Sequence, residues 1–123
     1  MNLLLVDDDP EIQFLAKFVL EQSGTFDVTG VETGADAKTM LQEMVFDALL
    51  LDVMLPDTNG LDFYEEMKKN LEGKTPPVIF LTAKEEEQVF RRMQQLGAVG
   101  FIQKPFNPSR LAEQVKSMLS VDG

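Results

Sequence analysis

Three runs of four apolar residues, Leu3–Val6, Ala48–Leu51 and Val78–Leu81, most constrain how this chain can fold. Each run has the length of a β-strand and lacks the alternation of apolar and polar residues found in strands that are solvated on one face. Continuous apolar strands of this kind are typical of sheets covered by helices on both faces. The sequence therefore predicts a central, buried, parallel sheet.

Helical patterns separate these strands. The predicted helices are a stretch from the Asp9-Pro10 cap to Gly24, one from Thr33 to about Met44, one from Leu61 to near Gly73, one over Glu85–Leu96, and one after the Asn107-Pro108 cap. Two further strands are predicted over Phe26–Gly30 and Val99–Ile102. Five strands that alternate with five helices predict a doubly wound α/β sheet, because right-handed crossovers make such strands parallel.

Length and composition limit the class of protein. The 123 residues fit one compact domain spanning 1–123, and no repeat or linker divides them. No apolar run approaches the roughly 20 residues of a membrane span, and no secretory signal pattern opens the chain. The absence of cysteine agrees with a cytoplasmic location and excludes disulfides and thiol chemistry.

The charged residues narrow the function further. A net charge of −10 argues against nucleic-acid binding by this domain alone, since phosphate backbones are bound by basic patches. The chain also contains no histidine, which removes the commonest general base and histidine-ligated metals. Its chemistry must use oxygen, amine or backbone groups.

Polar side chains follow four of the predicted strands. They are Asp7, Asp8 and Asp9 after the first strand, Asp52 after the third, Thr82 after the fourth, and Lys104 after the fifth. In doubly wound sheets the carboxyl ends of the strands share one edge, where ligands bind. We therefore expect these groups to converge at that edge.

Crowded carboxylates favour a bound cation. Two of them about 4 Å apart repel by roughly 4 kcal/mol at an effective dielectric near 20. An all-oxygen site favours Mg²⁺, or a similar hard ion such as Mn²⁺, and Mg²⁺ commonly accompanies phosphoryl groups. Asp52 is suited to be a nucleophile, Lys104 to pair with a phosphoryl oxygen, and Thr82 to donate a hydrogen bond.

Four segments together resemble a known family. In chain order they are LLLVDDDP (3–10), LLLDVMLPDTNG (49–60), VIFLTA (78–83) and FIQKPF (101–106). Their order and spacing are similar to those of the receiver domain of two-component response regulators, over essentially the whole chain. The resemblance implies a flavodoxin-like fold with strand order 2-1-3-4-5.

The resemblance also implies roles for individual residues. Asp52 would accept a phosphoryl group from the phosphohistidine of a histidine kinase or histidine phosphotransfer protein. The implied Mg²⁺ ligands are Asp8, Asp52, the backbone carbonyl of Met54, and Asp7 through a water molecule, whereas Asp9 caps the first helix. Such a domain is a signalling switch and not an enzyme, since it catalyses only its own phosphotransfer and slow dephosphorylation.

The implied switch links the phosphoryl group to a distant face. Lys104 would contact that group, and Thr82 would move towards it and let Phe101 turn inward. The face formed by the fourth helix, fifth strand and fifth helix would then change, for an output domain, an effector protein or a phosphorylation-dependent homodimer. Phe101 replaces the tyrosine often found in the family, and Phe14, which lies off the apolar stripe of the first helix, is a candidate docking contact for the kinase.

Other readings fit parts of the sequence. A phosphatase of the haloacid dehalogenase type also places Asp-x-Asp after its first strand, but it leaves Asp52 unexplained and usually needs a longer chain with a later acidic pair. A degenerate receiver that serves only as an interaction module is opposed by the retained site residues. Taken singly, Asp52 fits a loop aspartate, Thr82 a strand-ending hydroxyl, Lys104 a solvated charge, Phe101 a core aromatic and Phe14 a scattered surface residue.

Overall fold

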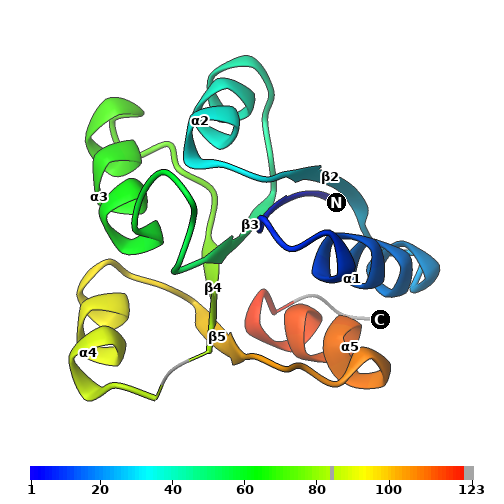
Figure 1. Cartoon of the computed structure of the whole chain (residues 1–123). Helices are drawn as coiled ribbons and strands as arrows, with labels where there is room; N and C mark the ends of the chain where they lie inside the picture. Colours follow the sequence, from blue (N-terminus) through cyan, green and yellow to red (C-terminus); the bar gives the residue numbers. More distant parts are fainter. Residues whose placement is uncertain (84, 121–123) are drawn as a thin grey trace.

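The computed structural model describes residues 1–83 and 85–120, which form a five-stranded parallel sheet between two helical layers (Figure 1). The strands are β1 (Asn2–Val6), β2 (Asp27–Val31), β3 (Ala48–Asp52), β4 (Val78–Thr82) and β5 (Gly100–Gln103). The helices are α1 (Pro10–Gln22), α2 (Gly34–Glu43), α3 (Gly60–Asn70), α4 (Glu87–Gln95) and α5 (Pro108–Met118). The order β2-β1-β3-β4-β5 confirms the predicted topology.

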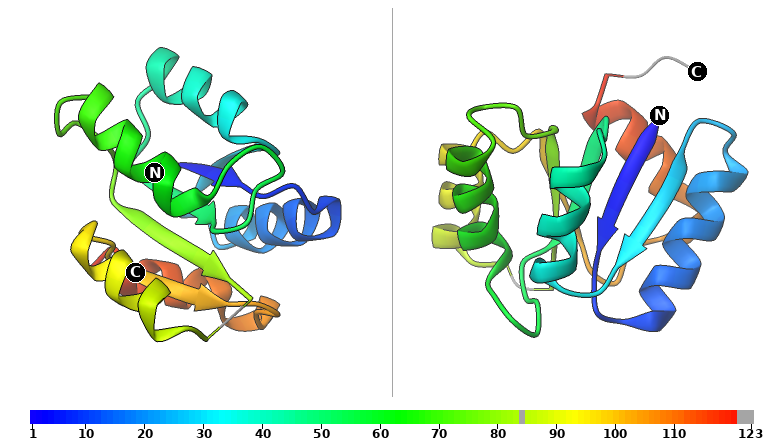
Figure 2. Two further views of the ribbon diagram at one scale, coloured as in Figure 1. Left: turned by 60° about the vertical axis from the view of Figure 1, so that its left-hand side comes forward. Right: turned by 90° about the horizontal axis from the view of Figure 1, so that it is seen from above.

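The two helical layers explain the continuous apolar strands. Helices α1 and α5 cover one face of the sheet, and α2, α3 and α4 cover the other (Figures 1 and 2). Successive residues of a strand point to opposite faces. Leu3 and Leu5 accordingly pack in the core beneath α1 and α5, whereas Leu4 and Val6 pack in the core beneath α2 and α3. All four side chains are fully buried, so both faces of the strand need apolar residues.

Local caps begin most helices where the sequence predicts. The side chains of Asp9, Thr33 and Asn107 accept hydrogen bonds from backbone N–H groups in the first turns of α1, α2 and α5. These bonds satisfy N–H groups that have no partner within a helix. Pro10 and Pro108 occupy the first turn of their helices, where no N–H is needed.

Helix α4 begins later than predicted. Residues 85 and 86 stay outside the helix, and Glu86 is the N-cap residue with an extended backbone and no side-chain cap bond. The acidic run from Glu85 therefore contributes only Glu87 to the first turn. Glutamate favours a helix start through its charge but is a poor cap compared with serine, threonine, aspartate or asparagine, which explains the error.

The helices are short. Within residues 1–83 and 85–120, none is long and apolar enough to cross a membrane.

Candidate functional site

The carboxyl ends of the strands bring three aspartates together. Asp52 is the last residue of β3, and Asp7 and Asp8 follow β1 directly. One carboxylate oxygen from each of these residues lies within 4.8 Å of the others. Asp7 and Asp52 are buried, whereas Asp8 is exposed. The structure thus forms the acidic cluster that the strand-end argument predicts.

Asp7 is held by backbone contacts between neighbouring strands. Its N–H donates to the carbonyl of Val31 at 3.1 Å, and its Oδ1 accepts from the N–H of Asp9 at 2.9 Å. Gln13 on α1 donates from Nε2 to the carbonyls of Asp7 at 2.9 Å and Val31 at 2.7 Å. Gln13 therefore joins the ends of β1 and β2, a role that no motif in the sequence indicates.

Lys104 joins two of the aspartates. Its Nζ lies 2.6 Å from Asp7 Oδ2 and donates to Asp52 Oδ2 at 2.9 Å. Asp7 Oδ2 is buried and finds no hydrogen-bond donor elsewhere among the residues that the structure describes. Lys104 directly follows β5, so its positive charge lies at the same edge of the sheet as the three aspartates.

Burial and these contacts shift the pKa values of Asp52 and Lys104. Burial raises the pKa of Asp52, and the neighbouring charge of Asp7 adds to this, against the hydrogen bonds from Lys104 and from the Met54 N–H. Burial by itself lowers the pKa of Lys104, but its hydrogen bonds to Asp7 and Asp52 outweigh that effect and raise the pKa. Lys104 therefore stays charged beside the two carboxylates.

The residues of the cluster fit a divalent cation. With every group ionised, three carboxylates and one ammonium leave two formal negative charges. The side-chain donors are all oxygens, which suits Mg²⁺ or Mn²⁺. Met54, whose backbone carbonyl is the further predicted ligand, lies next to this cluster, because its N–H donates to Asp52 Oδ1 at 3.1 Å.

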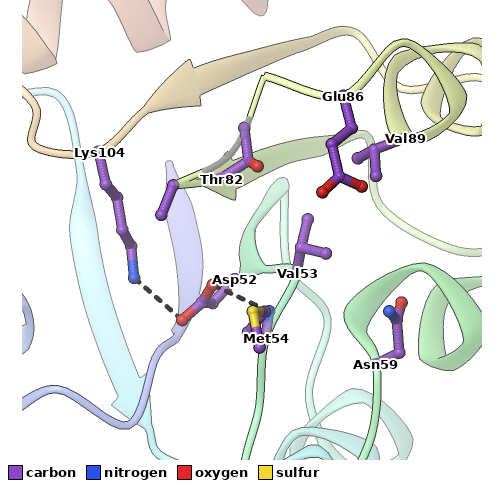
Figure 3. Close-up of a pocket in the computed structure, with 9 residues that line it drawn as sticks. Asp52, Val53, Met54, Asn59, Thr82, Glu86, Val89 and Lys104 are labelled. Carbon is purple, nitrogen blue, oxygen red and sulfur yellow. Dashed lines mark hydrogen bonds and ion pairs between the residues drawn. The ribbon is translucent and has the colours of Figure 1, made fainter.

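A cavity of about 280 Å³ opens beside Asp52 (Figure 3). Thr82 and Lys104 line it together with Met54 and Asn59, and the Glu86 carboxylate points toward it from the start of α4. Thr82 ends β4 and is buried. Asp52, Thr82 and Lys104 thus face one space.

Phe101 and Phe14 lie outside this cavity. Phe101 is 42% exposed on β5, which excludes the reading of a core aromatic, and its ring stacks on Phe90 of α4 with centroids 4.6 Å apart. Phe14 is 73% exposed on α1 and stacks on Phe18 with centroids 6.3 Å apart. Both phenylalanines therefore present aromatic surface to solvent.

The sequence is similar to those of response regulators. The model of a protein family described as the response regulator receiver domain matches residues 3–116. The phosphate regulon transcriptional regulatory protein PhoB of Escherichia coli is 36% identical over 118 residues, which cover 96% of this chain and 51% of PhoB. CpxR, a transcriptional regulatory protein of Klebsiella pneumoniae, is 38% identical over 96% of this chain and 49% of its own length. The chain spans about half the length of these regulators.

Solved structures show the same architecture. The non-phosphorylated HemR receiver domain of Leptospira biflexa has a TM-score of 0.86 at 34% identity, covering 99% of this chain and 96% of that chain. The chemotaxis response regulator CheY4 of Vibrio cholerae has a TM-score of 0.86 at 26% identity, covering 95% and 97%. Together with the strand order and the acidic edge, these matches leave no support for the phosphatase reading. The chain belongs to the family of response regulator receiver domains, the phosphoacceptor signalling switches of two-component systems.

Proposed function

We propose that residues 1–123 form a single receiver domain in which Asp52 accepts a phosphoryl group from the phosphohistidine of a histidine kinase or histidine phosphotransfer protein. The observation that carries this proposal is the position of Asp52. Its buried carboxylate contacts the Lys104 ammonium at 2.9 Å and borders the cavity that Thr82 also lines. Because the chain contains no histidine, the phosphohistidine must come from another domain or protein.

The transfer is a displacement at phosphorus. A carboxylate oxygen of Asp52 forms a bond to phosphorus, the bond between phosphorus and the histidine nitrogen breaks, and the imidazole leaves with that electron pair. Lys104 already lies beside the attacking group, where its charge would stabilise the phosphoryl oxygens.

The acidic cluster would hold a magnesium ion. The proposed ligands are Asp8, Asp52, the backbone carbonyl of Met54, and Asp7 through a water molecule, and Mn²⁺ suits the same donors. When bound, this ion would offset the repulsion among the carboxylates and neutralise charge on the phosphoryl oxygens. The oxygen-only donors and their spacing support this assignment.

Thr82 and Phe101 would turn phosphorylation into a change of surface. Thr82 would donate its hydroxyl to the phosphoryl group, and Phe101 would leave Phe90 and turn inward. The exposed stack of Phe90 on Phe101 supports an outward starting position. The affected face is made by α4, β5 and α5, and its readers would be an output domain, an effector protein or a second phosphorylated copy.

The exposed ring of Phe14 would be a docking contact for the kinase on α1. The exposure of Phe14 and its stack on Phe18 support that role. The net charge of −10 supports partners other than nucleic acid for this domain.

Intact-mass spectrometry tests the proposed phosphoacceptor. With Mg²⁺ and a small phosphodonor, we expect the protein to gain one phosphoryl group and Asp52→Asn to gain none. Asp36→Asn removes an exposed carboxylate elsewhere and should be phosphorylated normally. Phosphorylation of Asp52→Asn would refute the assignment, and an unmodified wild-type protein would favour an interaction module without phosphotransfer.

A further inference from the structure

The loop that follows Asp52 is tied to the start of α2 through Asp57. Its Oδ1 accepts a hydrogen bond from the backbone N–H of Gly34 at 2.9 Å, and its Oδ2 accepts one from Ala35 at 3.0 Å. The two partners lie 23 and 22 positions away in the sequence. A single carboxylate therefore joins the loop of residues 53–59 to a helix on the same side of the sheet.

These bonds complete the capping of α2. The first N–H groups of a helix have no partner within it. The side-chain hydroxyl of Thr33, the local cap, accepts from the N–H of Asp36 at 3.1 Å. Asp57 accepts from the N–H groups of Gly34 and Ala35, which the Thr33 side chain does not cap. The hydrogen bond from Gly34 lowers the pKa of Asp57, although the residue is exposed.

Backbone hydrogen bonds within the loop connect the region of Asp57 to the residues that follow Asp52. Leu55 N–H donates to the carbonyl of Thr58 at 3.2 Å, and Met54 pairs with Asn59 in an antiparallel bridge. At the base of the loop, Gly60 N–H donates to the carbonyl of Val53 at 2.7 Å. The two halves of the loop are thus bonded to each other near its tip and at its base.

Close packing at the tip and at the base of the loop leaves the loop little room to move. A Cβ on Gly34 would lie 2.7 Å from Thr58 Cγ2, so the loop tip rests directly on the first residue of α2. A Cβ on Gly60 would lie 2.2 Å from the carbonyl oxygen of Asp52, so the base of the loop packs directly against the backbone of Asp52.

We infer that Asp57 is a positioning residue for the phosphoacceptor site. By anchoring the loop on α2, it holds Met54, whose N–H orients Asp52 and whose carbonyl is a proposed Mg²⁺ ligand. This inference rests on the proposed function, because it assigns Asp57 to the same metal and phosphoryl site. Asp57 itself touches neither the phosphoryl group nor the metal in this scheme.

Two substitutions of Asp57 form a graded test. Asp57→Ala removes both hydrogen bonds, whereas Asp57→Asn retains one acceptor oxygen and replaces the other with a donor. The matched control is Asp36→Asn, which removes an exposed carboxylate from the same first turn of α2 without touching the loop. In the metal-free protein, hydrogen exchange at Gly34 and Ala35 should be fastest in Asp57→Ala and unchanged in Asp36→Asn.

Calorimetric titration with Mg²⁺ separates positioning from simple capping. Loss of groups that orient metal ligands typically weakens binding by about tenfold or more, and we expect about tenfold weaker binding in Asp57→Ala. Asp57→Asn should fall between Asp57→Ala and the wild type, and Asp36→Asn should bind normally. The rate of phosphorylation by a small phosphodonor should follow the same order.

Gly34→Ala perturbs the same junction without removing the carboxylate. Its new methyl group would press on Thr58 Cγ2, so Mg²⁺ binding should weaken here as well. This variant and Asp57→Asn decide the question if Asp57→Ala does not fold. A lower melting temperature with Mg²⁺ affinity equal to that of Asp36→Asn would overturn the inference, since Asp57 would then only cap α2. A wild-type protein that is not phosphorylated would instead refute the proposed function, while the exchange rates would still report the anchor.

Discussion

Lys104 donates a hydrogen bond of 2.9 Å to Asp52, which lies 52 positions earlier in the sequence. The same ammonium lies 2.6 Å from Asp7 Oδ2, so one positive charge serves two buried carboxylates. Without that charge, desolvation and mutual repulsion would act on both groups together. Lys104 therefore offsets part of the negative charge of the acidic cluster.

Replacing Lys104 with methionine should destabilise the metal-free protein. Methionine retains an apolar stem but leaves the carboxylates of Asp7 and Asp52 without their counter-charge. We expect the free energy of unfolding at neutral pH to fall by about 2 kcal/mol, as measured by urea denaturation. Lys17→Met removes an exposed charge and should change stability by less than about 0.5 kcal/mol. Equal stability of the two variants would contradict this account of Lys104.

The raised pKa of Asp52 predicts a specific pH dependence of stability. Between the ordinary carboxyl pKa of 3.8 and the higher value in the folded protein, the folded state holds the proton more tightly than the unfolded state. Stability from this group therefore falls as pH rises through that interval, and the ionised form is destabilising at neutral pH.

Asp52→Asn should accordingly unfold at higher urea concentration than the wild type at neutral pH without Mg²⁺. The advantage should shrink as the pH falls through that interval toward 3.8 and vanish below it, because the wild-type carboxyl is then protonated in both states. Glu43→Gln neutralises an exposed carboxyl and should show no such pH-dependent gain. A stability difference that stays constant with pH would rule out the titration of Asp52 as its cause.

Mg²⁺ should stabilise the folded protein through the acidic cluster. A ligand that binds only the folded state adds about 2.7 kcal/mol at a hundredfold excess over its dissociation constant. We expect the melting temperature to rise with Mg²⁺ and to respond much less in Asp8→Asn, which removes a proposed direct ligand. Sodium chloride at matched ionic strength controls for general screening. An Asp8→Asn variant with an unchanged response would remove Asp8 from the site.

A single tryptophan can report the proposed movement of Phe101. The chain contains no tryptophan, so Phe101→Trp introduces the only indole. Phosphorylation with a small phosphodonor and Mg²⁺ should bury this ring and shift its emission to shorter wavelength. Phe14→Trp places the probe at an exposed site on α1 and should show no shift. An unchanged spectrum for phosphorylated Phe101→Trp would mean that the ring does not turn inward.

Much of the fold follows from patterns within short stretches of sequence. Continuous apolar runs such as Leu3–Val6 predict buried strands, and Asp9-Pro10 predicts the start of α1, because backbone geometry and helix capping act over a few residues. Parallel strands also share the direction of their carboxyl ends. For that reason the meeting of Asp7, Asp8 and Asp52 was predictable without knowledge of any long-range contact.

Only the tertiary structure decided how the groups at that edge are connected. Lys104 bridges Asp7 and Asp52, Gln13 bonds the ends of β1 and β2, and Asp57 anchors its loop on α2. Most of these contacts join residues far apart in the sequence, and all of them depend on loop conformation and side-chain rotamers. Apolar periodicity and capping signals carry no information about either, which is why the sequence by itself determined that Asp7, Asp8 and Asp52 meet at one edge, whereas the folded chain determined how they are bonded.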